Sequence, residues 1–159
     1  MNVILDISNF QLNNIIFLEN KRNMIMDGTF SKIIYSTQYF SLNSIYLTFP
    51  LEIQSLDKQM NKYIMKYNPY SIINAQLIQD LSKIEYRIIE YYKQINHINK
   101  RTNCILNKQL LTGNLKMYKD FNLSKINKNP PEYIIKISGI WENNNEIGLT
   151  YKIIESYEL

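Results

Sequence analysis

Two lysines near the end of the chain, Lys136 and Lys152, are spaced so that they could share a phosphate group. They lie in the segment KISGIWENNNEIGLTYKI, in which two apolar-rich runs flank three consecutive asparagines. If the asparagines form the turn of a β-hairpin, Lys136 faces Lys152 across the two strands. Like charges directly opposite one another destabilise a sheet by roughly a few tenths of a kcal/mol, and a bound phosphate would reverse that sign. The pair therefore indicates a phosphate contact, although two long side chains that extend into water explain it equally well.

The same hairpin register predicts one uncharged face. With Asn143, Asn144 and Asn145 as the turn, the pairs on that face are Trp141–Ile147, Gly139–Leu149, Ile137–Tyr151 and Ile135–Ile153. We expect this register along the whole hairpin, because a slip of one residue would move every side chain to the other face. Trp141 then belongs to the core, and base stacking by Trp141 is the alternative interpretation.

Other cations and aromatic rings lie on or beside predicted strands, where a sheet could present them together. Proteins that bind single-stranded nucleic acid combine a basic groove with aromatic side chains on which bases stack. The candidate nucleic-acid-binding residues are Lys32, Tyr35, Tyr46, Lys116, Tyr118, Lys119, Lys136 and Lys152. Codon usage offers a second explanation for this set, because the chain is dominated by Asn, Ile, Lys and Tyr, all residues of AT-rich codons.

Residues that could support catalysis or hold a cofactor are sparse. One histidine and one cysteine do not make a common zinc site, and the four glycines are too scattered for a phosphate-binding loop. No serine or cysteine lies in a nucleophile motif. Glu85 and Glu90 fall on a predicted helix, where we expect them to be solvated. We therefore expect no cofactor, no metal site and no enzymatic activity.

Length and charge bound the class of protein. The 159 residues suffice for one domain with a core of its own, and we assign 1–159 to a single domain. A balance of 18 basic and 14 acidic residues gives a net charge of +4, which permits a polyanionic partner without requiring one. A lone cysteine suits a reducing compartment. The start, MNVILDISNF, has neither a charged segment nor a long apolar stretch, so we expect no secretion and no membrane partner.

Strands at both ends of the chain would have to position the candidate residues. SIYLTFPLEI alternates apolar and polar residues, which predicts a strand that breaks at Pro50, with Tyr46 opposite its apolar side. TFSKIIYSTQYF is β-branched and aromatic, and Asp27-Gly28 predicts a turn that pairs it with Met24–Met26 or with NNIIFLEN. Val3–Ile7 and Leu115–Tyr118 are predicted as short strands, and DFNLSKINKNPPE as a loop.

The middle of the chain has a helical pattern instead. Apolar residues recur at steps of four and three at Leu77, Leu81, Ile84, Ile88, Tyr91, Ile95 and Ile98, and Ile73, Ile78, Ile89 and Tyr92 widen the stripe. Start signals lie at Asn68–Ser71, and a polar stretch from Asn96 marks the end. The width of the stripe favours a helix packed on its own sheet over a coiled coil. A shorter stripe (Leu56, Met60, Tyr63, Ile64, Tyr67) predicts a preceding helix.

The order of strands, helix and strands predicts a β-rich α+β fold. It is the order of an OB-fold, a five-stranded barrel with a helix between its third and fourth strands. An α+β sandwich with one helical layer fits the same order. We therefore expect an OB-like barrel of five or more strands, with the long helix between the third and fourth core strands.

The segments FPLEIQ, IIEYY, NKQLLTGNLKMY and KISGIWENNNEIGLTYKI resemble uncharacterised proteins of nucleocytoplasmic large DNA viruses. Through them the chain is similar to the phage-type single-stranded-DNA-binding proteins of such viruses, which are OB-folds. The resemblance spans about Ser44 to Ile153. It implies a place in the host cytoplasm, at the viral factory, or in the virion, with replication proteins or self-association as further contacts. The family's acidic tail with an aromatic end is reduced here to ESYEL.

Residues and resemblance together predict non-catalytic binding of single-stranded nucleic acid, DNA in viral replication or repair, with little sequence preference. The alternative function is that of a virion structural or assembly protein, which acts through protein–protein contacts. In the first function a basic and aromatic face binds the nucleic acid, whereas in the second the basic face and the long helix meet protein partners.

Overall fold

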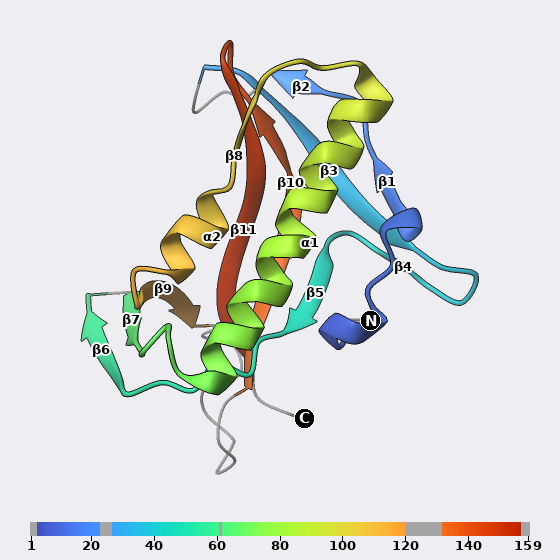
Figure 1. The fold of residues 1–159 in the computed structure, drawn as a ribbon. Coiled ribbons are helices and arrows are strands. Elements are labelled where there is room, and N and C mark those ends of the chain that lie inside the picture. The colour runs from blue at the N-terminus through green and yellow to red at the C-terminus, as the bar shows by residue number, and fades with distance from the viewer. Residues whose placement is uncertain (1–2, 23–26, 61, 120–131, 157–159) are drawn as a thin grey trace.

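The computed structural model describes residues 3–22, 27–60, 62–119 and 132–156. Its helices are η1 (Ile7–Asn9) and η2 (Leu12–Asn14), both of the 3-10 type, α1 (Ile72–Asn96) and α2 (Ile105–Leu110). Its strands are β1 (Ile15–Phe17), β2 (Lys21–Arg22), β3 (Thr29–Ser36), β4 (Ser41–Leu42), β5 (Ile45–Thr48), β6 (Ser55–Gln59), β7 (Lys62–Lys66), β8 (Arg101–Asn103), β9 (Asn114–Lys119), β10 (Glu132–Glu142) and β11 (Glu146–Ser156). The predicted β-rich α+β class is confirmed (Figure 1).

The strands form one mixed, 11-stranded sheet around the β10–β11 hairpin. The main path runs β1-β3-β10-β11-β9-β7-β6, and β1 and β6 end it among the described strands, so the sheet is open and not a closed barrel. The edge of β10 that faces away from β11 pairs with β3 and with β5, which are both antiparallel to β10. The edge of β11 that faces away from β10 pairs with β8 and with β9, which are both parallel to β11. The hairpin therefore connects strands that precede α1 in the sequence with strands that follow it.

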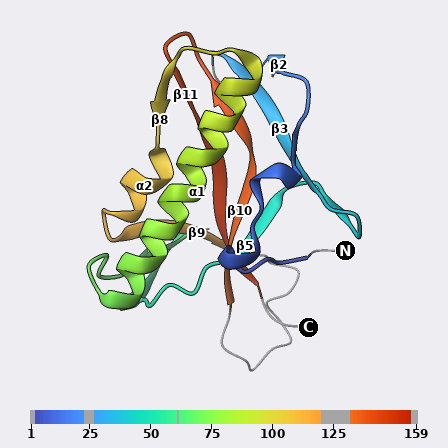
Figure 2. The same cartoon turned by 45° about the vertical axis from the view of Figure 1, so that its right-hand side comes forward.

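Helix α1 begins and ends where the sequence predicts. The Ser71 hydroxyl accepts a hydrogen bond from the Asn74 N–H at 3.2 Å, and His97 ends the helix in the left-handed conformation with φ 52°. Leu81, Ile88 and Ile89 are 0% exposed and belong to the same core as the apolar residues of the hairpin. The helix runs across one face of the sheet (Figures 1 and 2), which confirms that it packs on its own sheet.

Two shorter predictions in the first half of the chain are wrong. The segment Ser55–Lys66, predicted as a helix, is the antiparallel β6–β7 hairpin, and its turn contains Met60 with φ 52°. Tyr63, Ile64 and Met65 form a short apolar run that fits a buried strand as well as a helix, and pairing of β7 with β9 favours the strand. Val3–Ile7 makes only an isolated bridge between Leu5 and Leu47 before η1 begins. The predicted loop DFNLSKINKNPPE lies almost entirely outside the described residues.

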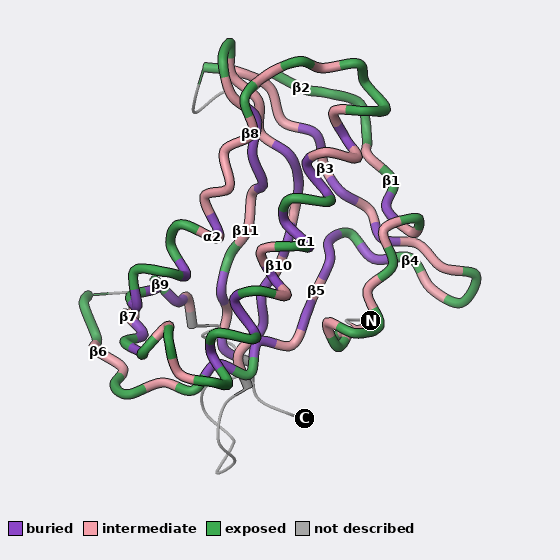
Figure 3. Tube along the Cα trace, in the orientation of Figure 1, coloured by how far each residue is buried: buried purple, intermediate pink, exposed green. Residues whose placement is uncertain are grey.

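Helix α2 is held by a buried carboxylate on α1. Glu85 is 0% exposed, so the prediction that it is solvated is wrong. Its two oxygens accept hydrogen bonds from the backbone N–H groups of Leu106 at 2.8 Å and Asn107 at 2.9 Å, which satisfies the start of α2. Burial raises the pKa of Glu85, and these two hydrogen bonds act in the opposite direction. The core thus continues from α1 under α2, and the buried stretches of α1 and the central strands are shown in Figure 3.

Candidate nucleic-acid interface

The β10–β11 hairpin pairs Lys136 with Lys152, as the sequence predicts. The predicted pairs Ile135–Ile153 and Ile137–Tyr151 are also confirmed. Beyond Ile137 a β-bulge shifts the register by one residue. The predicted register is therefore correct far from the turn and wrong near it.

The bulge moves Trp141 out of the predicted core. Trp141 pairs with Gly148 instead of Ile147, and Gly139 pairs with Thr150 instead of Leu149. One extra residue in a strand reverses the side to which the following side chains point. Ile140 consequently takes a place in the core, whereas Trp141 is partly exposed and outside it.

Alternating burial defines two faces of the central strands. Ile135 and Ile137 belong to the core that α1 covers, and Lys136 between them points to the other side, which we name the outer face. Lys152 shares this face by its pairing with Lys136. Ile134, next along β10 on the outer face, is only 3% exposed, so the open part of the face begins at Lys136.

A row of two tyrosines and three lysines crosses the outer face. It consists of Tyr46 on β5, Lys136 on β10, Lys152 on β11, Tyr118 on β9 and Lys62 on β7, and we name it the outer-face row. Neighbouring strands lie about 4.8 Å apart, so four steps between strands give the row a length of about 19 Å. Five side chains from five neighbouring strands therefore form a row across the sheet, with a step of two residues between β11 and β9, where Tyr118 pairs with Ile154.

The two paired ammonium groups lean away from one another. Lys136 Nζ lies 5.9 Å from the ring centroid of Tyr46, and Lys152 Nζ lies 4.3 Å from that of Tyr118. Lys62 Nζ approaches Tyr118 as well, at 6.0 Å. Ammonium groups are attracted to the faces of aromatic rings at such distances. The tyrosines thus reduce the repulsion that the sequence predicts between the two lysines.

The lysines of the row have no carboxylate partner in the part of the chain that the structure describes. The ion pairs there are Lys66–Asp57, Lys93–Glu90, Lys100–Glu142 and Arg101–Glu146. Lys62, Lys136 and Lys152 take part in none of these pairs. Their charges consequently remain available to an anion that approaches the outer face.

The remaining predicted residues divide between the two faces. Lys116 is exposed and lies two residues before Tyr118 on β9, so it is on the outer face. Lys32 pairs with Gly139 and lies on the outer face as well. Tyr35 does not: it is 1% exposed, and its hydroxyl accepts hydrogen bonds from the Gln11 N–H at 3.0 Å and from Asn14 Nδ2 at 3.3 Å. Alternation along β3 places Tyr35 on the core side with Ile33. The prediction of Tyr35 as a binding residue is therefore wrong.

Lys119 is the last of the predicted set. It pairs with Glu155 in the parallel register of β9 and β11. Its side chain lies outside the described residues, so its predicted contact with nucleic acid stays a prediction.

Three outer-face residues are absent from the predicted set. The sequence does not place Lys62 on this face, because its segment is predicted as a helix, and it does not place Trp141 there, because the β-bulge reverses the direction of that side chain. Phe30, on β3, pairs with Trp141. Glycine inside a strand often marks a bulge or a close approach, and Gly139 and Gly148 carry that signal in the sequence.

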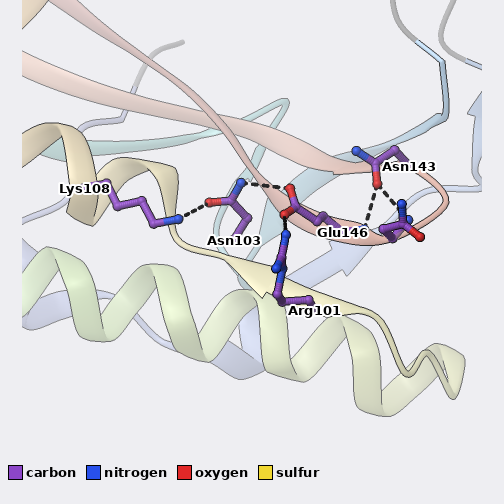
Figure 4. Close-up of polar contacts among 6 residues, drawn as sticks. Arg101, Asn103, Lys108, Asn143 and Glu146 are labelled. Carbon is purple, nitrogen blue, oxygen red and sulfur yellow. Dashed lines mark hydrogen bonds and ion pairs between the residues drawn. The ribbon is translucent and has the colours of Figure 1, made fainter.

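The tip of the hairpin is fixed by polar contacts with β8 (Figure 4). Glu146 accepts hydrogen bonds from Arg101 and, at 3.1 Å, from Asn103 Nδ2, and these bonds lower the pKa of Glu146. The Asn143 side chain accepts the backbone N–H groups of Asn145 at 2.9 Å and Glu146 at 2.7 Å, which closes the turn. The strands that carry Lys136, Lys152 and Trp141 are therefore held in place at the tip of the hairpin.

Comparisons with protein-family models, with curated proteins and with solved structures return no match for this chain. Of the helices in the described ranges, none has both the length and the apolar character that crossing a membrane requires.

Proposed function

We propose that this chain binds single-stranded nucleic acid on the outer face of its sheet, without catalysis. The observation that carries the proposal is the outer-face row, in which two tyrosines that can stack with bases lie beside three lysines that can contact phosphates. A strand carries one phosphate per roughly 3.4 Å in helical geometry, so a row of about 19 Å corresponds to about five to six nucleotides. Phosphate contacts and stacking read no base edges, so little sequence preference is expected.

Stacking on Tyr118 requires the Lys152 ammonium to leave the ring. An exposed contact of this kind is worth about 0.5–1 kcal/mol, whereas a base stacked on an aromatic ring contributes about 1–3 kcal/mol. The exchange is favourable, and it releases an ammonium group at the place where the adjoining phosphate lies. Lys152 and Tyr118 thus contact one another in the free protein and separate when the nucleic acid binds.

The finer aspects of the proposal rest on the resemblance to the viral proteins. These aspects are a relationship of the sheet to the OB-fold, a role in viral DNA replication or repair, contacts with replication proteins or a second copy, and a place in the host cytoplasm or the virion. An open sheet presents the same kind of surface as the strands of an OB-fold barrel, because both align side chains from successive strands.

A virion or assembly role through protein contacts is the second candidate, and one feature favours it. An apolar hollow of about 530 Å³ lies between α1 and α2, lined in part by Tyr70, Ile78, Tyr86 and Leu111. Beside it Tyr70 is 78% exposed, Ile72 92% and Tyr86 54%. Exposed apolar groups gathered in this way are typical of protein interaction surfaces.

Fluorescence anisotropy of a labelled oligo-dT, titrated with the protein at two salt concentrations, separates these functions. We expect binding at low salt that weakens as salt is added, because lysine–phosphate contacts release counterions. The variant Lys136→Ala/Lys152→Ala should bind more weakly. The matched variant Lys83→Ala/Arg87→Ala, which removes two exposed charges from α1, should bind as the wild type does. Absence of binding even at low salt would contradict the proposal and favour the assembly role.

A further inference from the structure

Two aromatic rings on the outer face lie over strand glycines near the tip of the hairpin. A Cβ placed on Gly148 would lie 2.7 Å from Nε1 of Trp141 and closer still to two carbons of the indole ring. A Cβ on Gly139 would lie 2.6 Å from Cε2 of Phe30. Such distances are not tolerated in proteins, so glycine at these positions is what lets each ring approach the backbone.

The arrangement leaves part of the indole ring free. Trp141 covers Gly148 with one side, yet it remains partly exposed and lies outside the core. Phe30, its pairing partner on β3, is partly exposed as well. An aromatic ring supported from below by a strand is held ready for a second planar group, because its position is already fixed.

A groove joins these rings to the outer-face row. It has a volume of about 1000 Å³, and its lining includes Phe30, Lys116, Tyr118, Trp141, Thr150 and Lys152. It follows the edge of β11 between the residues that pair with β8 and those that pair with β9. Lys116 also lines a neighbouring hollow of about 360 Å³ together with Lys62, so the groove continues toward that end of the row.

We propose that Trp141, with Phe30 beside it, stacks with an unpaired nucleobase at the hairpin-tip end of this groove, while Lys152 and Lys116 contact the phosphates that follow. This inference rests on the proposed function, and it names the position of one base and the path of the strand. Trp141 is the single tryptophan of the sequence, and its indole is the largest aromatic ring in the chain. The β-bulge after Ile137 is the element that turns this ring toward the strand instead of the core.

The single tryptophan allows a direct test on the unmodified protein. Oligo-dT is added while tryptophan fluorescence is recorded, and the anisotropy of a labelled oligo-dT is measured in parallel. We expect the fluorescence to change with the same midpoint as the anisotropy. A rise in anisotropy with constant fluorescence would overturn the role of Trp141 and leave the proposed function intact. A constant anisotropy at low salt would overturn both.

An abasic oligomer of the same length separates stacking from charge. It keeps the phosphates and lacks the bases, so we expect it to bind by charge alone without altering tryptophan fluorescence. The same fluorescence change with both oligomers would contradict stacking on Trp141.

Variants give a second readout. Trp141→Leu should weaken oligo-dT binding by about 5- to 150-fold, equivalent to ~1–3 kcal/mol, and Trp141→Phe should restore most of the affinity. Tyr86→Leu removes an exposed ring from α1 and should leave the affinity for oligo-dT unchanged. Circular dichroism confirms that each variant is folded. Unchanged affinity in a folded Trp141→Leu would refute the inference.

Discussion

The ammonium groups of Lys136 and Lys152 illustrate how a repulsive pair is accommodated in a sheet. The pairing of the two residues follows from the sequence, but the direction of each side chain depends on a tyrosine in the next strand. Each ammonium exchanges contact with its counterpart for an aromatic face, which is worth about 0.5–1 kcal/mol at an exposed site. The pair is therefore close to neutral for stability, and the positive charge of both residues is preserved for a ligand.

Removal of both lysines should change the free energy of unfolding little. Lys136→Ala/Lys152→Ala loses cation–π contacts and gains relief from the opposed charges, and each effect is less than about 1 kcal/mol. Urea denaturation measures the difference. A loss of several kcal/mol would mean that the aliphatic stems pack as part of the fold, and the weaker binding of this variant would then have a structural cause.

Tyr118 is the residue of the row at which stacking and charge meet. Tyr118→Phe keeps the ring and should bind oligo-dT as tightly as the wild type, whereas Tyr118→Ala should lose about 1–3 kcal/mol of binding free energy. Anisotropy titrations give both values. Equal loss in the two variants would assign the effect to the hydroxyl and not to the ring.

At the scale of elements, α1 provides the rigid layer behind the outer face. Its caps and its inward stripe follow directly from residue type and spacing, because Ser71 and the apolar positions act locally. The exact width of the buried stripe does not follow from the sequence. Ile73 is 57% exposed and Ile95 is 50% exposed, although both belong to the predicted stripe.

Ile88→Ala should lower the free energy of unfolding by about 2–5 kcal/mol, because this side chain is 0% exposed. Ile73→Ala is the matched control on the same helix and should cost less than about 0.5 kcal/mol. Urea denaturation of both variants is the measurement. Equal effects would show that the stripe is not packed on the sheet as described.

The buried carboxylate of Glu85 should make stability depend on pH. Burial raises its pKa in the folded state above the unfolded value of about 4.3, so the native chain binds more protons than the unfolded chain between the two values. The contribution of Glu85 to the free energy of unfolding is therefore greatest below pH ~4.3 and declines as the pH rises through the folded pKa. Glu85→Gln cannot titrate and should lack this decline in a pH series of urea denaturations. Parallel curves for the two proteins would exclude the effect.

At the scale of the whole molecule, two layers assign different tasks to the two faces of one sheet. One face packs against α1 and α2, and the other gathers lysines and aromatic rings from strands distant in the sequence. The sequence predicts Tyr46, Lys116, Tyr118, Lys136 and Lys152 on that face, because period-two alternation survives in their strands. It does not predict Trp141, since a bulge is invisible to alternation, or Lys62, since its short hairpin also fits a helical period.

Binding at the outer-face row is tested most directly by the salt dependence of affinity. The dissociation constant for oligo-dT is measured at a series of salt concentrations for the wild type, for Lys136→Ala/Lys152→Ala and for Lys83→Ala/Arg87→Ala. Each phosphate neutralised on a single strand contributes roughly 0.7 to the slope of log affinity against log salt, so loss of both row lysines should reduce the slope by about 1.4. The α1 variant should keep the wild-type slope. An identical slope in all three proteins would contradict phosphate binding by Lys136 and Lys152.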